Sequence, residues 1–176
     1  MSITVRSIIA GAAASALTLA ACGGEKPAPA GDSAGAASSV ASAATAQPGQ
    51  GEKIYAQRCQ SCHQLNGAGA PGVYPPLAGS EFVVDANPAV PASIVIHGLQ
   101  GPITVKGEPF NSLMPAYGIG ITMTDEEVAA VVTYIRTSWG NTASAVTAAD
   151  VASAREATKS HSGAMTAEAL APLRSK

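Results

Sequence analysis

The hydrophobic positions of this chain divide it into zones of different character. An apolar run extends from Ile8 to Leu19, and a long stretch of mostly small residues then continues to Gln50. Amphipathic segments begin only after that stretch. The clearest lies within 124–140, where apolar residues recur at helical spacing at Val128, Val131, Val132 and Ile135. The pattern therefore predicts one folded region that begins near Gly49.

This last helix also carries its own start and stop signals. Thr124 is the predicted N-cap, because Glu127 stands three residues later and can complete a capping box with it. Acidic residues at this end also suit the positive end of the helix dipole. We expect the helix to end at Gly140, directly after Trp139.

Shorter elements are expected before it. Residues 51–58 predict a helix with Ile54 and Tyr55 buried, whereas 66–79 are too rich in Gly and Pro for regular structure and predict a loop. The β-branched run 94–96 is compatible with a strand as well as a helix. Three further short elements are expected: a helix over 81–84, a helix from Pro88 or Pro91 to His97 that Gly98 ends, and a hairpin around 103–105.

The C-terminal region, 143–176, is Ala-rich and only weakly apolar. Thr147 is a second candidate N-cap, and 151–159 are compatible with one more helix. The sequence leaves three outcomes open for this region: it folds back on the domain, it serves as a docking segment, or it is disordered.

Residues 1–21 have the pattern of a signal peptide, with one positive charge at Arg6, an apolar run, and small residues before Cys22. The run is short for a membrane span, which needs about 20 apolar residues. Leu19-Ala20-Ala21-Cys22 resembles a bacterial lipobox, which implies that Cys22 is acylated and begins the mature chain. Two acyl chains would hold a protein stably at a membrane. The alternatives are an uncleaved anchor and ordinary cleavage that leaves Cys22 without a role.

The stretch 22–48 is mostly Ala, Gly, Ser, Pro and Thr, a composition typical of a disordered tether. As a flexible coil it would reach roughly 30 Å. We therefore divide the chain into a signal peptide (1–21), a lipidated linker (22–48), a folded domain (49–142) and a C-terminal extension (143–176).

The composition predicts a weak hydrophobic core, because only 4% of the 176 residues are aromatic, while 18 are Gly and 12 are Pro. A large apolar group in the middle of the domain would compensate for this. Cys59-Gln60-Ser61-Cys62-His63 has the pattern of covalent c-type haem attachment. Each thiol would form a thioether to one vinyl group, and His63 would supply one axial nitrogen to iron.

Other chemistry fits this motif less well. A structural zinc site needs four ligands, and the sequence has no second Cys pair or His-rich cluster. A thioredoxin-like dithiol expects a βαβ setting. A disulfide between Cys59 and Cys62 would leave His63 without a role.

On this motif and the segments that follow it, the stretch from about Gly49 to Gly140 resembles class I cytochrome c. The resemblance implies an all-α fold of short helices around one covalently bound haem c. It also implies that Pro75 gives its carbonyl oxygen to the His63 imidazole and that Leu77 packs on the porphyrin ring. As an alternative, the Pro pair at this point is only a stiff turn.

In the same family a Met-Pro pair marks the distal ligand loop, so the resemblance implies that Met114 is the second axial ligand. Met123, directly before a helix cap, and Met165, in the tail, are the alternatives. His97 is a further alternative, although its place at a helix end favours capping or a contact with the haem propionates.

The family resemblance further implies that the first and last helices cross. Gly51 and Tyr55 would then meet Val131 and Tyr134.

The resemblance implies an electron carrier rather than an enzyme, because His/Met ligation leaves no vacant iron position. We expect a lipid-anchored protein on the periplasmic side of a bacterial membrane that passes single electrons between redox partners such as a dehydrogenase, oxidase or reductase. Two alternatives stay open: a ligand-binding or peroxidase-type haem protein with an open sixth position, and a structural subunit of a larger oxidoreductase.

The charge of the folded domain indicates how it would approach its redox partners. Between Gly49 and Thr142 the chain has four basic and seven acidic residues, a net charge of −3 before any haem propionates. It lacks the ring of lysines that steers mitochondrial-type cytochromes c to acidic partners. We expect docking through apolar contacts and no nucleic-acid partner.

Overall fold

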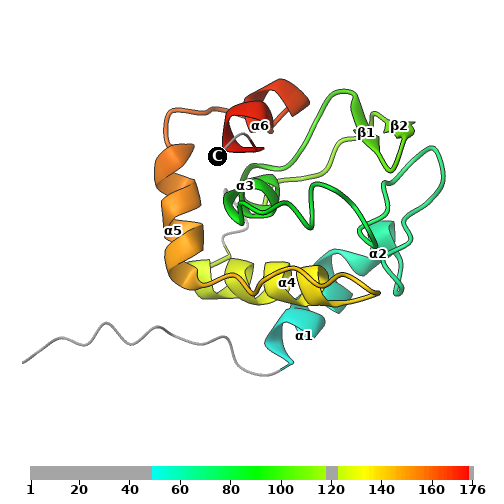
Figure 1. Ribbon diagram of the computed structural model, residues 1–176, viewed down its shortest axis with the longest axis horizontal. Coiled ribbons are helices and arrows are strands. Elements are labelled where there is room, and N and C mark those ends of the chain that lie inside the picture. Colours follow the sequence, from blue (N-terminus) through cyan, green and yellow to red (C-terminus); the bar gives the residue numbers. More distant parts are fainter. Residues whose placement is uncertain (1–48, 118–122, 175–176) are drawn as a thin grey trace, which may run out of the picture. The chain divides into compact units, whose positions relative to one another are not determined.

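The computed structural model describes residues 49–117 and 123–174, so the predicted signal peptide, the linker and Cys22 lie outside the described residues. The described part is mostly helical with one two-stranded sheet (Figure 1), which confirms the all-α class. No helix in this part is long and apolar enough to cross a membrane. In chain order the elements are α1 (Gln50–Arg58), α2 (Gln60–His63), α3 (Ala89–His97), β1 (Ile103–Val105), β2 (Glu108–Phe110), α4 (Asp125–Thr137), α5 (Ala148–Ala157) and α6 (Ala167–Arg174).

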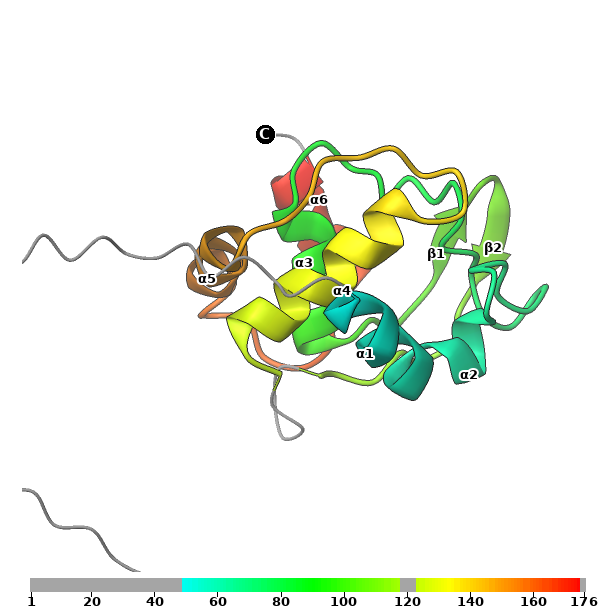
Figure 2. The ribbon, with the colours of Figure 1, turned by 90° about the horizontal axis from the view of Figure 1, so that it is seen from below.

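The first helix crosses α4 at very short range (Figure 2). A Cβ atom added to Gly51 would lie 2.1 Å from the Ala130 carbonyl oxygen and 2.8 Å from the Tyr134 Cβ atom. Only glycine therefore lets the two helices approach this far. Beside this point the rings of Tyr55 and Tyr134 pack with their centroids 5.5 Å apart. The expected crossing is present, with Ala130 rather than Val131 at the closest contact.

Capping boxes start both α4 and α5. The Glu127 N–H donates to the Thr124 hydroxyl, while the Thr124 N–H donates to the Glu127 carboxylate. Thr147 and Asp150 make the same exchange at α5. Both predicted caps are confirmed, although α5 covers Ala148–Ala157 rather than 151–159.

The predicted end of α4 at Gly140 is wrong by three residues. The helix stops at Thr137, because Ser138 is extended and its hydroxyl donates to the Tyr134 carbonyl. Trp139 then takes a φ of 55°. Its ring centroid lies 4.9 Å from that of Tyr55, so the chain leaves the helix where the partly buried indole packs against the core.

The helix predicted over 81–84 is also wrong. The N–H groups of Val83 and Val84 both donate to the Ser80 carbonyl and form an isolated turn. Its continuation is disfavoured by Pro88, because the residue before a proline avoids the helical region. The helix predicted from Pro88 is confirmed as α3, which Gly98 ends with a φ of 77°. The strand alternative for 94–96 is therefore wrong.

The predicted hairpin is confirmed as β1 and β2, which pair antiparallel with Ile103 opposite Phe110.

The core has two clusters, and the C-terminal extension contributes to both. Val151 and Ala154 of α5 join the cluster built on α1, α3 and α4. Leu170 and Leu173 of α6 join the second cluster, which includes the hairpin residues Ile103, Val105 and Phe110. Of the three outcomes left open for the extension, the structure therefore shows the first: it folds back on the domain (Figure 1).

Arg136 ties the start of the extension to this core. Its buried guanidinium donates to the carbonyls of Val83 (2.7 Å) and Asp85 (2.9 Å), and its Nε to that of Ser144 (2.8 Å). Burial lowers the pKa of Arg136, an effect that Asp85 and Asp150 oppose. One side chain thus holds α4, the 80–84 turn and the extension together.

Candidate functional site

A single helical turn brings the three motif residues together. Cys59 follows α1, and the N–H groups of Cys62 and His63 both donate to its carbonyl, at 3.2 and 2.9 Å. Both cysteines are free thiols, so the disulfide alternative is not adopted. Burial raises the pKa of Cys59 to about 11; nearby Arg58 opposes this and Cys62 adds to it. Two thiols and one imidazole thus stand on one turn.

The orientation of the His63 ring is fixed by the loop that follows it. Its Nδ1 lies 3.0 Å from the Pro75 carbonyl oxygen. Because a carbonyl only accepts, Nδ1 carries the hydrogen and Nε2 keeps its lone pair for a metal. Burial lowers the pKa of His63, which the bond to Pro75 opposes. The expected contact between Pro75 and His63 is therefore present, and the His63 imidazole is in the tautomer that can bind iron.

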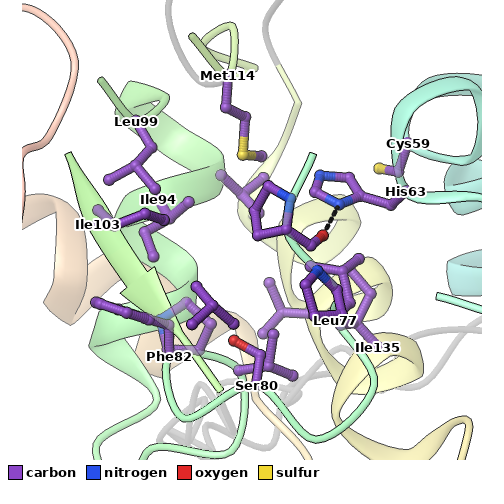
Figure 3. Close-up of a pocket in the computed structure, with 17 residues that line it drawn as sticks. Cys59, His63, Leu77, Ser80, Phe82, Ile94, Leu99, Ile103, Met114 and Ile135 are labelled. Carbon is purple, nitrogen blue, oxygen red and sulfur yellow. Dashed lines mark hydrogen bonds between the residues drawn. The ribbon is translucent and has the colours of Figure 1, made fainter. Parts of the chain in front are cut away.

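An apolar cavity opens beside this imidazole, and the sulfur of Met114 points into the same space from another side (Figure 3). The empty space here measures about 670 Å³, open solvent at its mouth included. A single serine, Ser80, adds a hydroxyl to the lining. The apolar lining includes Leu77, Phe82, Ile94, Leu99, Ile103 and Ile135.

The backbone of Met114 is held by the segment that follows α3. The Leu99 N–H donates to the Met114 carbonyl (3.1 Å), and the Met114 N–H donates to the Leu99 carbonyl (2.8 Å). A Cβ atom at Gly98 would lie 2.4 Å from the Met114 carbonyl oxygen, so this approach requires glycine. Farther along, the Tyr117 hydroxyl donates to the Arg58 carbonyl at 2.8 Å. The Met114 segment is thus tied to both α3 and α1.

The alternative ligands lie elsewhere. Met123 and Met165 are 4% and 1% exposed, and each packs in one of the two core clusters without lining the cavity. His97 directs its Nε2 to the Thr158 hydroxyl at 2.8 Å and does not line the cavity either. Of the candidates named from the sequence, Met114 is the one that faces the cavity with His63.

Sequence reasoning missed Asn141, which shapes the wall of this cavity. Its side-chain oxygen accepts from the Gly79 N–H at 2.8 Å, and its amide nitrogen donates to the carbonyls of Leu77 (3.1 Å) and Ile135 (2.8 Å). It thereby fixes the backbone of the loop that carries Leu77. Its position directly after Gly140 is the only signal in the sequence.

Residues 49–139 match the family model described as Cytochrome c. The chain belongs to the cytochrome c family. As a family member it binds covalently attached haem c, and the two thiols, the imidazole and the apolar cavity fit that group. The zinc alternative has no ligand set in the described part, where no three His, Cys, Asp or Glu side chains gather to hold a metal ion.

Curated relatives share the same region. Cytochrome c-552 of Thermus thermophilus is 44% identical over 94 residues, which cover 52% of this chain and 69% of the relative. The cytochrome c subunit of the quinone alcohol dehydrogenase of Gluconacetobacter polyoxogenes is 38% identical over 107 residues, or 60% of this chain. That of gluconate 2-dehydrogenase from Pantoea cypripedii is 38% identical over 117 residues, or 64% of this chain. The chain spans only 22% and 26% of these two dehydrogenase subunits.

Proposed function

We propose that this cytochrome c is an electron carrier and not itself an enzyme. It accepts one electron from a reduced donor protein and passes one electron to an oxidised acceptor. When bound, haem c supplies an iron that alternates between ferric and ferrous states. The observation that carries the proposal is that His63 and Met114 point into one cavity. Two side chains are thus available for the two axial positions of the iron, which would leave no position for a substrate.

The protein's own residues then set the properties of the carrier. The Pro75 carbonyl holds the His63 ring in one orientation and increases its basicity. A thioether ligand raises the reduction potential relative to two nitrogen ligands. The apolar lining would limit the access of water to the iron when haem c is bound, which would disfavour the more highly charged ferric state. Together these features favour a carrier of relatively high potential.

Carbon monoxide tests the carrier against the ligand-binding alternative. The haem-loaded protein is reduced and exposed to the gas, and its absorption spectrum is recorded over time. We expect the spectrum to stay unchanged, because both axial positions are filled. Rapid formation of a carbon monoxide adduct by the native protein would contradict the proposal and favour a sensor or peroxidase-type protein.

The proposed location is the periplasmic side of a bacterial membrane, with the lipid anchor on Cys22. The support is the pattern of the sequence, in which an apolar run and Leu19-Ala20-Ala21 precede the cysteine. Cys22→Ser should release the protein from the membrane fraction or block its maturation, without changing the haem spectrum of the domain that is made. Unchanged membrane retention would indicate an uncleaved anchor instead.

The proposed electron donor is a dehydrogenase, a class suggested by the names of the relatives. The haem-loaded protein would be isolated from native membranes under mild conditions. We expect a dehydrogenase to co-purify and to reduce the cytochrome when its substrate is added. Co-purification with an oxidase alone, and no reduction by dehydrogenase substrates, would assign the protein to another chain of electron carriers.

A further inference from the structure

Three chain segments pair side by side at Leu99. This residue pairs antiparallel with Met114 and, on its other side, parallel with Met165. The Met165 N–H donates to the Gly98 carbonyl at 3.1 Å, and the Gln100 N–H donates to the Met165 carbonyl at 2.8 Å. One peptide segment, 98–100, therefore connects the candidate axial ligand directly to the C-terminal extension.

Side chains reinforce the same connection. Met165 is 1% exposed, Leu170 of α6 is fully buried, and both share a cluster with Leu99. Met114 is partly buried and packs against both core clusters, this one and the one built on α1, α3 and α4. The extension is also fixed on the far side of α6, where the Asn87 side-chain amide donates to the Leu173 carbonyl at 2.8 Å. Segment 98–100 thus rests on a well-packed support that the extension supplies.

Met114 depends on this support because its neighbours in the chain are exposed, and the next attachment, from Tyr117 to Arg58 and Val95, lies three residues further on. Residues 111, 113 and 115 are exposed, and the neighbouring side chain of Leu113 is 67% exposed. Met114 itself lies in neither a helix nor a strand of the described fold. Its two hydrogen bonds with Leu99 therefore carry much of its positioning.

We propose that the C-terminal extension is a clamp for the axial methionine, with Met165 as its positioning residue. The clamp fixes segment 98–100, which in turn holds the Met114 sulfur at the cavity and slows its replacement by other ligands. The family match ends at residue 139, so the clamp lies outside the matched domain. This inference rests on the proposed ligation by Met114.

The experiment uses the full-length, haem-loaded protein and two variants, Met165→Ala and Leu170→Ala. Imidazole serves as a small competing ligand that binds the ferric protein only when Met114 leaves. We expect the rate of imidazole binding to rise by about tenfold or more in both variants, because each leaves a cavity beneath the clamp. Hydrogen exchange of the Met114 amide, measured by NMR on the reduced protein, should accelerate by a similar factor.

Two further variants separate the clamp from a general loss of stability. Val131→Ala removes an equally buried side chain, 1% exposed, from the other cluster. It should lower thermal stability while changing neither readout more than about twofold. Met165→Leu keeps the volume and the backbone pairing, so it should behave like the native protein.

The outcomes distinguish the clamp from the ligation on which it rests. If Met165→Ala and Leu170→Ala change imidazole binding and Met114 exchange no more than Val131→Ala does, the clamp is wrong. Met114→Ala provides the reference for ligation through the sulfur-to-iron charge-transfer band of the oxidised protein. If Met114→Ala loses the band while Met165→Ala binds imidazole and exchanges the Met114 amide as the native protein does, the clamp alone is wrong. A Met114→Ala protein that keeps the band overturns the ligation as well.

Discussion

Cys59 and Cys62 are the residues through which the haem becomes part of the core. Replacing either by Ala should reduce covalently bound haem and leave the domain largely unfolded, because the apolar space between His63 and Met114 would lose the group that fills it. The haem content of purified protein and its far-ultraviolet circular dichroism check this prediction. A variant with native helicity but no haem would contradict it.

In the proposed ligation, Met114 sets the electronic properties of the site. Met114→Ala should abolish the sulfur-to-iron charge-transfer band and lower the reduction potential, while both thioethers remain. Optical spectroscopy and redox titration measure these effects. Met123→Ala is the matched control, because Met123 is buried in the core without lining the cavity. If the control loses the band and Met114→Ala keeps it, the ligand has been wrongly assigned.

Asn141 gives a prediction about stability. Asn141→Ala would leave the Gly79 N–H and the carbonyls of Leu77 and Ile135 without this partner. Of the three bonds only the one to Ile135 is buried, and the Leu77 carbonyl still accepts from the Ser80 N–H. An unpaired buried polar group costs about 1–3 kcal/mol, so we expect the free energy of unfolding to fall by about 1–3 kcal/mol in denaturant titrations. A fall below about 0.5 kcal/mol, typical of surface changes, would contradict the role assigned to Asn141.

These residues differ in how well they could be predicted from the sequence. The motif ending at His63 could be recognised because its chemistry demands fixed spacing, and Met114 because proline follows it. Asn141 could not, because its bonds reach residues up to 64 positions away. Gly98 was predicted as a helix end, whereas its close approach to Met114 depends on how two distant segments meet.

Among the elements, the contact between α3 and the segment after α5 should depend on pH. His97 is buried at the end of α3, its Nε2 bonds to Thr158, and its Nδ1 has no partner among the described groups. Burial lowers the pKa of His97, and nearby His161 and Arg155 lower it further. The unfolded residue has a pKa of about 6.5. Below that pH the unfolded chain binds a proton at this histidine and the folded chain does not. The free energy of unfolding therefore decreases as the pH is lowered.

The melting temperature of the haem-loaded protein should therefore decrease between about pH 7.5 and pH 5.5. His97→Gln, which can still bond to Thr158 but does not titrate, should show a smaller decrease over this range. Equal decreases in the two proteins would show that another group controls the acid response.

Elements with strong local signals were predicted well, and elements defined by long-range packing were not. The capping residues Thr124 and Thr147 located two helix starts from sequence alone. The early end of α4 was missed, because it depends on where Trp139 packs against Tyr55. Helix α6 was not predicted and the docking of the extension was left open, since the two buried leucines of α6 give no long periodic signal.

For the molecule as a whole, we expect weak electrostatic steering toward partners. The region 49–142 has a net charge of −3, and exposed charges are screened beyond about 10 Å at 0.1 M salt. Electron-transfer rates with the native partner should change less than about threefold as salt rises from low to moderate concentration. Stopped-flow kinetics test this, and a steep fall in rate would reveal a local charge patch that governs the encounter.

The same kinetics can locate the docking surface, because the chain offers a matched pair of exposed leucines. Leu113 is 67% exposed and lines a second pocket, which shares His63 and Met114 with the cavity described above, whereas Leu65 is 70% exposed and lines neither pocket. Leu113→Ser should slow electron transfer more than Leu65→Ser does. The reverse order would place docking on another face.

The hydrogen bond between His97 and Thr158 also bears on the order of assembly. These residues are 61 positions apart, and contacts between such distant positions form more slowly than local ones. The turn that carries Cys59, Cys62 and His63 is held by bonds between residues at most four positions apart. We therefore expect this turn to form before the segment with Thr158 docks on α3 when the chain folds.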